Sequence, residues 1–322
     1  MIQARAIPAC EQGFSVRAVD IKPFGQWCQI HDGVQACRLD LSKLDDCREA
    51  VRGMDTVYNM AANMGGIAFI NSHKAECLLL VLINTHLLLA ARDAGLRRYF
   101  ASSAWVYNMN RQADPDVTPL KETDADGSEK LFGERMCRHF HEELGRGDTC
   151  ARLHNIYGLN GSDNDGSEKA ATALCRTVAE AVLTGRHEIE IWGDGEQTRS
   201  FMYVDDRVDA IELVVAGDNA LPVNVGGIGR VSINQMVGMI EQIAGITVKR
   251  TYRFDAPLGV RGRNSDNTVF RTLYNWEPTI GLAEGLERTY RSIFDQLTAQ
   301  ASAHTARSTV QARLGRSVPA AH

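Results

Sequence analysis

The sequence of 322 residues lacks most features that would place it in a specialised class. Lys and Arg number 35 against 40 Asp and Glu, so the formal net charge is -5 and no basic stripe points to a nucleic acid partner. The 8 cysteines are scattered without a C-x-x-C pair, which favours reduced thiols in a cytoplasm over a disulfide framework. No His, Cys and Asp cluster has metal-ligand spacing, so no metal site is predicted.

Long hydrophobic runs are missing as well. The longest candidate, Cys77 to Ala91, is interrupted by Asn84, Thr85 and His86, so we expect no membrane span and no membrane contact. The opening residues, MIQARAIPAC, contain no apolar core of a signal peptide. With 44% hydrophobic and 23% charged residues, the composition is that of a globular protein able to bury a large core.

Apolar strand patterns alternate with helical patterns through the first 150 residues. Ser42 is predicted to cap the first helix and Gly95 to end the second. The predicted strands and helices are Phe14–Asp20, Gly33–Leu41, a helix over Ser42–Arg52, Met54–Ala62, a helix over His73–Gly95, and Arg97–Ser103. This alternation predicts an α/β fold with a Rossmann-like, doubly wound parallel sheet.

Such a sheet binds ligands at the carboxyl ends of its strands. Asp20 and Asp40 stand at two of these ends, where a carboxylate can bind the ribose hydroxyls or adenine of a dinucleotide; alternatively, both residues simply start turns. A first strand and a G-x-x-G-x-x-G turn, whose N–H groups hold the pyrophosphate, should precede Asp20, but only Gly13 stands there. We therefore expect the N-terminal first strand and glycine loop to be missing, through a late start codon or a degraded gene.

The stretch from Tyr99 to Glu134 runs from a buried strand, through a loop, into a helix. A Y-x-x-x-K pair on one helix face places a tyrosine base beside a lysine in the dehydrogenation of sugar hydroxyls. Here the corresponding residues are Asp126 and Lys130. An aspartate accepts a proton from a sugar hydroxyl only weakly, because its reference pKa is far lower. Taken alone, Lys130 is better explained as a solvated helix lysine than as a catalytic one.

The pattern changes after residue 150. We predict an NAD-binding lobe over residues 1–150, to which segments near 205–225 return, a nucleotide-sugar-binding lobe over 151–297, and a disordered tail or frayed helix over 298–322. The predicted elements of the second lobe are helices over Glu168–Thr184, Ser232–Gly245 and Ile280–Leu297, and extended segments over Glu188–Trp192, Gln197–Val204, Val223–Val225 and Val248–Arg253.

Several blocks together carry a resemblance to a known family. They are NMAANMGGIAFI (59–70), ASSAWVY (101–107), ARLHNIYG (151–158), SEKAATALCR (167–176), WGDGEQTRSFMYVDD (192–206) and GVRGRNSDN (259–267). Over roughly residues 4–295 the sequence resembles the extended short-chain dehydrogenase/reductases, the NAD-dependent epimerases and dehydratases. Within that group it is similar to the enzymes that epimerise GDP-mannose at C3 and C5. The W-G-D-G-x-Q-x-R-x-F pattern is shared by many nucleotide-sugar enzymes, whereas the G-G-I-A-F-I, S-E-K-A and G-V-R-G-R-N-S-D-N segments are more specific.

The resemblance implies a mechanism with NAD as cofactor and GDP-mannose, or a related nucleotide sugar, as substrate. C4 is oxidised to a ketone, a cysteine base and a lysine acid invert C3 and C5 through an enolate, and the hydride then returns to C4. It also implies a homodimer, in which the helices around His73–Gly95 and Ser128–Leu144 pair across a two-fold axis.

The resemblance further implies which residues form the site. The cofactor-binding residues are Asp20, Asp40, Ala61, Ala62 and Lys130. The catalytic residues are Ser103, Lys130 and Lys169, of which Lys169 is the acid. The substrate-binding residues are Gly65, Ser103, Asn155, Glu168, Lys169, Ala170, Gln197, Thr198, Arg199 and Arg261. Trp105 occupies the position of the cysteine base, and Asp126 that of the catalytic tyrosine.

Three functional readings stay open. The first is a nucleotide-sugar epimerase acting on GDP-mannose with altered chemistry. The second is a catalytically inactive homologue that binds a nucleotide sugar or acts as a dimer partner. The third, a 4-epimerase or 4,6-dehydratase, is weaker because Trp105 and Asp126 disturb those reactions equally.

Overall fold

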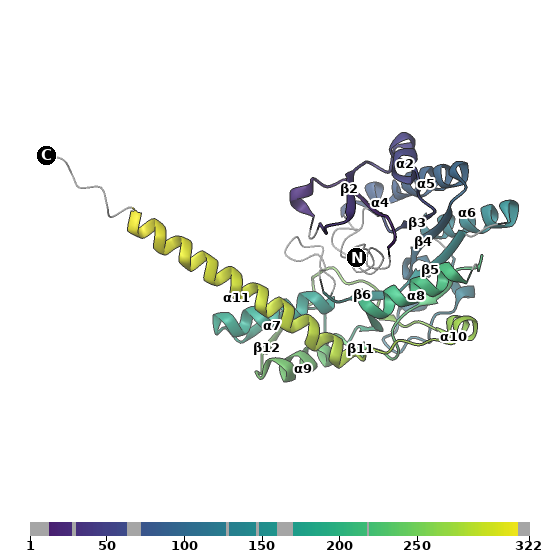
Figure 1. Cartoon of the computed structure of the whole chain (residues 1–322). Coiled ribbons are helices and arrows are strands. Elements are labelled where there is room, and N and C mark those ends of the chain that lie inside the picture. Colours follow the sequence, from purple (N-terminus) through teal and green to yellow (C-terminus); the bar gives the residue numbers. More distant parts are fainter. Residues whose placement is uncertain are drawn as a thin grey trace.

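The structure is a computed structural model, shown in Figure 1, and it describes residues 13–27, 30–62, 72–126, 129–145, 148–159, 170–217 and 219–314. Its central sheet has four parallel strands in the order β10-β5-β4-β3. These strands are β3 (Thr56–Asn59), β4 (Arg97–Ser103), β5 (Asp148–Leu153) and β10 (Val223–Val225). The edge strand β10 follows β5 by about 70 residues in the sequence, so the chain returns to this sheet after building much of the second lobe.

Helices cover both faces of this sheet. Tyr99 and Phe100 are neighbours on β4 and both are buried, so they point to opposite faces. Phe100 packs with Cys137 of α6 (Glu129–Leu144), whereas Tyr99 lies in the main core with Ala210 of α8 (Val204–Ala216). A parallel sheet buried on both sides confirms the predicted α/β, Rossmann-like fold.

A smaller parallel pair, β1 (Val16–Asp20) and β2 (Val34–Arg38), stands apart from the central sheet. It is followed by α2 (Leu44–Val51), which packs against α5 (Leu80–Ala94). The Arg17 guanidinium donates to three carbonyls at the end of α2, at 2.9–3.0 Å. Among the described strands, none pairs with the second edge of β1 or of β3. The prediction of a missing first strand concerns residues 1–12, which lie outside the described residues.

The second lobe consists of small sheets packed on helices. In Figure 1, α7, α9 and α11 lie together beneath the central sheet. The strands pair as β6 (Asn155–Tyr157) with β9 (Phe201–Tyr203), β7 (Glu188–Trp192) with β12 (Lys249–Arg253), and β8 (Thr198–Arg199) between β11 (Val231–Ser232) and β13 (Gly262–Arg263). The helices are α7 (Ala170–Thr184), α9 (Ile233–Ala244), α10 (Thr268–Tyr274) and α11 (Leu282–Leu314). The remaining short helices are α4 (Lys74–Leu78) and the 3-10 turns at Phe24–Gln26, Ala104–Val106, Met109–Gln112 and Glu122–Asp124.

Three predicted elements differ from the structure. The helix predicted over His73–Gly95 is divided at Leu79 into α4 and α5. Ser42 does not cap α2, because its N–H and hydroxyl both bind the Asp40 carboxylate. The last helix, predicted to end at Leu297, continues to Leu314 and projects from the body of the molecule in Figure 1, so of the two alternatives for the tail residues 298–314 follow the helical one.

Candidate functional site

The carboxyl end of β4 brings Ser103 and Lys130 together. The buried Lys130 ammonium donates to the Ala101 carbonyl at 3.0 Å and lies 5.0 Å from the centroid of the Phe100 ring. Ser103 stands two residues further along β4, and its hydroxyl accepts the Trp105 N–H at 3.4 Å. Lys130 of α6 is therefore bound to β4 two residues before Ser103, and the catalytic roles of both residues stay predictions.

A buried ion pair fixes the helix that carries Lys130. One turn further along α6, Glu134 accepts the Ser102 hydroxyl at 2.5 Å and two bonds from Arg152 of β5, at 2.9 and 2.7 Å. Lys130 and Glu134 lie on one helix face because they are four residues apart. Lys130 binds Ala101 and Glu134 binds Ser102, which are consecutive residues of β4. These hydrogen bonds fix α6 against the strand that ends at Ser103.

Asp126, at the position of the expected tyrosine, lies on the surface. Its carboxylate accepts the Asn108 side-chain amide at 2.7 Å, and its N–H donates to the Val106 carbonyl at 3.2 Å. Tyr107 does not replace the missing phenol. Its hydroxyl is buried and donates to Asn224 at 2.5 Å, and burial raises its pKa to about 12. A phenol with such a pKa stays protonated at neutral pH.

Three arginines gather where β8 and β13 lie side by side. Arg199 and Arg263 are directly paired in the register of these strands. Burial, together with the charge of a neighbouring arginine, lowers the pKa of Arg199 to about 10 and that of Arg263 to about 9. Arg261 forms a two-pronged pair with Asp194 at 2.8 and 2.9 Å, and hydrogen bonds from Arg261 lower the pKa of Asp194 to about 2.

The recorded partners of the other two arginines are neutral. Arg199 donates to the Thr198 and Val260 carbonyls at 2.7 and 2.6 Å, and Arg263 donates to the Gln112 side chain at 2.6 Å. Positive charge therefore exceeds negative charge at this point, and such a cluster favours a phosphate-bearing ligand.

The other predicted substrate residues lie on β6, on and before β8, and at the start of α7. Asn155 of β6 donates to the Ser200 carbonyl at 3.0 Å. Gln197 donates to the Trp192 carbonyl at 3.0 Å, and its buried side-chain oxygen has no partner in the part of the chain that the structure describes. Thr198 bonds the Pro115 carbonyl, and Ala170 begins α7. Gly65, Glu168 and Lys169 lie outside the described residues.

On the cofactor side, the two aspartates differ. Asp20, at the end of β1, accepts the Lys22 N–H at 2.9 Å through one oxygen, and its second oxygen has no partner among the described residues. Asp40 binds the Ser42 N–H and hydroxyl at 3.0 and 2.6 Å, and the hydroxyl is the main reason that its pKa is lowered. Asp40 therefore starts a turn, whereas Asp20 keeps an oxygen available for a ligand. Ala61 and Ala62 follow β3.

Comparison with known proteins identifies the family. Residues 9–226 match the model of the NAD dependent epimerase/dehydratase family. The chain belongs to this family. It is 38% identical over 268 residues to GDP-mannose 3,5-epimerase 1 of Oryza sativa subsp. japonica, covering 80% of this chain and 70% of the rice protein. It is 37% identical over 271 residues to GDP-mannose 3,5-epimerase of Arabidopsis thaliana, again covering 80% and 70%.

A solved structure supports the fold of this epimerase/dehydratase family member. UDP-glucose 4-epimerase of Thermotoga maritima, determined with UDP-glucose, superposes with a TM-score of 0.81 over 92% of this chain and 96% of that one. The sequences are 24% identical, so this likeness bears on the fold alone.

Sequence reasoning missed several residues of the site in this family member. Arg263 lies two positions after the predicted Arg261, and only the pairing of β13 with β8 shows that it joins Arg199. Gln112, which holds Arg263, carries no signal in the sequence because 151 residues separate the two. The Glu134–Arg152 pair joins α6 to the next strand, β5, 18 residues further along the chain, and no motif in the sequence indicates it.

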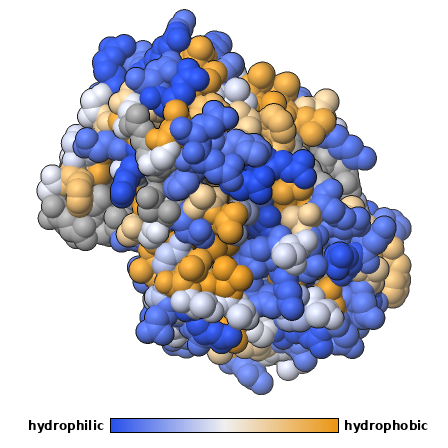
Figure 2. Space-filling view, turned by 90° about the vertical axis from the view of Figure 1, so that its right-hand side faces the viewer, coloured by the Kyte–Doolittle hydropathy of each residue, from blue (hydrophilic) through white to orange (hydrophobic). Residues whose placement is uncertain are grey.

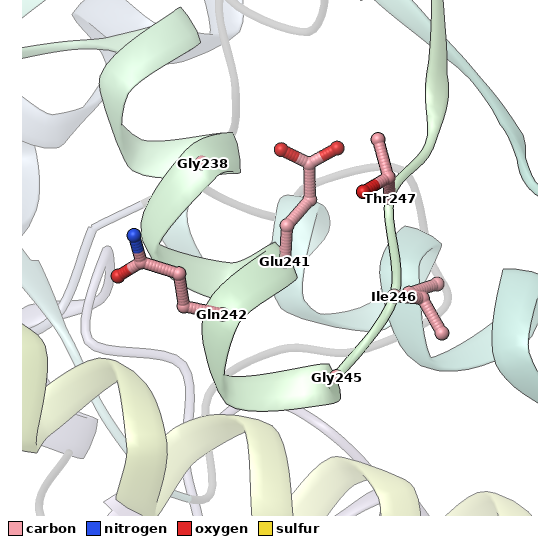
Figure 3. A pocket seen from close by; sticks show the side chains of 6 residues that line it. All are labelled: Gly238, Glu241, Gln242, Gly245, Ile246 and Thr247. Atoms are coloured by element: carbon pink, nitrogen blue, oxygen red, sulfur yellow. The ribbon is translucent and has the colours of Figure 1, made fainter.

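A cavity among the described residues lies away from this site. It measures about 460 Å³ and lies between the end of α9 and the start of β12, where Gly238, Glu241, Gln242, Gly245, Ile246 and Thr247 line it (Figure 3). The Glu241 carboxylate is bound to the Val248 N–H and to Arg250, each at 2.7 Å. Both carboxylate oxygens of Glu241 are therefore engaged within the protein, and we do not assign the reaction centre to this cavity.

Proposed function

We propose that the protein is a nucleotide-sugar epimerase that acts on GDP-mannose, or a related nucleotide sugar, with NAD. The observation that carries the proposal is the identity of 37–38% to plant GDP-mannose 3,5-epimerases over 80% of the chain. The arginine cluster at β8 and β13 supports it, since two guanidinium groups with neutral partners suit the diphosphate of such a substrate.

The residues present fit NAD at the carboxyl ends of β1, β3 and β4. Asp20 offers a carboxylate oxygen to the ribose, Ala61 and Ala62 provide small side chains after β3, and Lys130 holds a buried ammonium at the end of β4. When bound, NAD accepts a hydride from C4 of the sugar and returns it. Asp40 fits this role less well because both its oxygens are engaged by Ser42 and Lys43.

The chain's own residues then bind and orient the sugar. The Ser103 hydroxyl would hydrogen-bond the sugar near C4, and the Lys130 ammonium would stabilise negative charge that develops beside it; the position of Ser103 at the end of β4 and the bond of Lys130 to the same strand support these roles. Lys169 is proposed as the acid that returns a proton to the inverted carbon. Trp105 cannot act as the base that removes the proton from C3 or C5, because an indole offers an N–H donor and no acceptor. Asp126 is a weak base for a sugar hydroxyl and is bound to Asn108.

This geometry favours a second candidate function. With an indole at the base position, an aspartate at the phenol position and Tyr107 buried, the protein would bind a nucleotide sugar without turning it over. The two candidates share the binding site and differ only in chemistry.

Hydrogen exchange on the substrate separates them. The protein is incubated with GDP-mannose and NAD in D2O, and C3 and C5 are followed by NMR. Deuterium at either carbon is expected for the epimerase, and its absence despite GDP-mannose binding would favour the second candidate. The double variant Trp105→Cys with Asp126→Tyr should exchange faster than the natural sequence, because it supplies a thiol base and a phenol.

We also propose a cytoplasmic homodimer built on α5 and α6. Leu82 of α5 and Phe132 of α6 are large apolar side chains that are 39% and 52% exposed, and the two helices are in contact. Figure 2 faces the side on which these helices lie in Figure 1, and orange apolar patches interrupt its polar surface. The cytoplasm is proposed because five cysteines in the described part of the chain, Cys37, Cys47, Cys137, Cys150 and Cys175, carry free thiols.

The stretch Lys74–Ala94 bears on the membrane prediction. It is long and apolar enough to cross a membrane by length and composition, and 39% of its most apolar window is buried inside the molecule. A core helix of a globular protein passes the same test, and Leu87, Leu88 and Ala91 of this stretch are buried. The absence of membrane contact therefore stays a prediction.

A further inference from the structure

We propose that Trp105 is a binding platform on which the hexose ring of the nucleotide sugar stacks, so that this residue sets sugar affinity instead of moving a proton. The inference rests on the proposed function, since it names how the same site would hold the sugar. Two observations carry it. The turn after β4 directs the indole away from the core, and Arg263 packs over the indole ring.

The turn at Ala104–Val106 directs Trp105 away from the core. Its neighbours Ala104 and Val106 are 2% and 0% exposed and pack in one small core with Tyr107 and Leu120. Trp105 lies outside that core and is only partly buried. The bond from its N–H to the Ser103 hydroxyl, at 3.4 Å, fixes the start of the turn. The backbone of Trp105 is thus bound to the Ser103 hydroxyl, and its large ring extends from this turn outside the small core.

A buried cation supports this ring. The guanidinium carbon of Arg263 lies 5.3 Å from the centroid of the Trp105 ring, which is within cation–π range. Arg263 is buried and is held by the Gln112 side chain at 2.6 Å, so it is a fixed support. Because Arg263 comes from β13 and Trp105 follows β4, the stack joins the arginine cluster to the end of the central sheet.

This arrangement suits a pyranose ring. One face of a hexopyranose presents C–H groups that pack on an aromatic ring. The hydroxyl groups at the edge of the sugar form hydrogen bonds with polar side chains such as Ser103. The arginine cluster would take the diphosphate of the same molecule. A rigid aromatic ring loses little conformational entropy when it is covered, so it is an efficient binding surface. The ligand class is a nucleoside diphosphate hexose.

The experiment compares GDP-mannose with GDP by isothermal titration calorimetry, with NAD present, on the full chain and its variants. The increase in affinity from GDP to GDP-mannose, called the sugar increment below, measures how strongly the protein binds the sugar. The affinity for GDP alone measures binding at the nucleotide site. We expect Trp105→Ala to weaken GDP-mannose binding by about tenfold and to leave GDP binding nearly unchanged. Trp105→Phe, which keeps an aromatic face, should retain most of the increment. Trp192→Ala, at a partly exposed tryptophan on β7, is the matched control and should change neither ligand.

Each other outcome is decisive. If Trp105→Ala leaves the sugar increment unchanged or enlarges it, Trp105 only fills the site and the platform is refuted. If the natural sequence binds GDP and GDP-mannose equally, there is no sugar increment and the platform fails while nucleotide binding stands. If neither ligand binds, the proposed function itself fails, and the platform with it.

Discussion

At the scale of single residues, two buried arginines make opposite contributions to stability. Arg98 and Arg207 are each 1% exposed. Arg98 is bonded to Asp148, Asn84 and Cys137. Arg207 reaches only the Met60 sulfur at 3.8 Å, and two of its nitrogens have no partner in the part of the chain that the structure describes. Burial lowers the pKa of Arg207 to about 10, which reflects an uncompensated charge.

Replacing Arg207 with methionine should therefore stabilise the fold. The apolar chain fills similar space without a buried charge, so we expect a gain of about 1–3 kcal/mol in the free energy of unfolding. Thermal and denaturant unfolding measure this gain. The matched variant Arg98→Met removes a fully bonded guanidinium and should destabilise by a similar amount. A loss of stability in Arg207→Met would contradict this account.

His154 makes stability depend on pH. It is buried, its Nδ1 has no described partner, and its Nε2 lies 3.4 Å from the Asn224 oxygen. Burial, followed by the charge of Arg263, lowers its pKa to about 3. The unfolded chain takes up this proton near pH 6.5 and the native state does not, so stability is complete above pH 6.5 and falls as the pH decreases towards 3.

Between pH 7 and pH 5 this proton should account for a loss of about 2 kcal/mol. His154→Gln should remove that part of the pH dependence in denaturant titrations at the two pH values, whereas His187→Gln, at an exposed histidine, should keep it. An unchanged pH dependence in His154→Gln would show that the imidazole is protonated in the native state.

The residue scale also shows how far the sequence predicts the site. The family resemblance assigns Ser103, Lys130 and Arg199 to the site, and the structure has Ser103 at the end of β4, Lys130 bound to β4 and Arg199 on β8, while their roles stay predictions. It cannot find Gln112 or Glu134, because their partners come from distant segments that only the folded sheet brings close. The role of Lys169 stays a prediction.

At the scale of elements, the contact between α6 and β4 depends on a glycine. A Cβ added at Gly133 would lie 2.7 Å from the Phe100 ring and 2.8 Å from the Asn84 amide. Gly133→Ala should therefore push α6 from the sheet and destabilise by about 1–3 kcal/mol. Because α6 carries Lys130, cofactor affinity should fall as well. Gly238→Ala is the control, since that helical glycine has only one neighbour, at 3.9 Å, and alanine there should stabilise slightly.

Capping residues in the sequence predict the ends of helices correctly where no neighbouring side chain competes for the same hydrogen bond. Ser232 and Gln235 form the capping box at the start of α9, and Gly245 ends it in a left-handed conformation, as the sequence indicates. Ser42 fails as a cap because Asp40, two residues earlier, competes for its hydroxyl. Gly95 ends α5 as predicted, yet the break at Leu79 has no proline or glycine to announce it.

At the scale of the whole molecule, the proposed dimer is open to a direct test. Leu82→Glu with Phe132→Glu places two charges on the exposed faces of α5 and α6 and should produce a monomer. Sedimentation velocity measures the change. Leu183→Glu, at an exposed leucine on α7, is the matched control and should leave the mass unchanged. A natural sequence that sediments as a monomer would refute the proposed dimer.

The separation of β1 and β2 from the central sheet has a consequence for how the molecule opens. A two-stranded ribbon is only marginally stable by itself, and this one is held by α2, by the packing of α2 on α5, and by the bonds of Arg17. Amides of β1 and β2 should therefore exchange with solvent deuterium through local opening, well before those of β4 and β5. The segment that carries Asp20 would then be a separate cooperative unit, and a ligand that binds Asp20 would slow its exchange selectively.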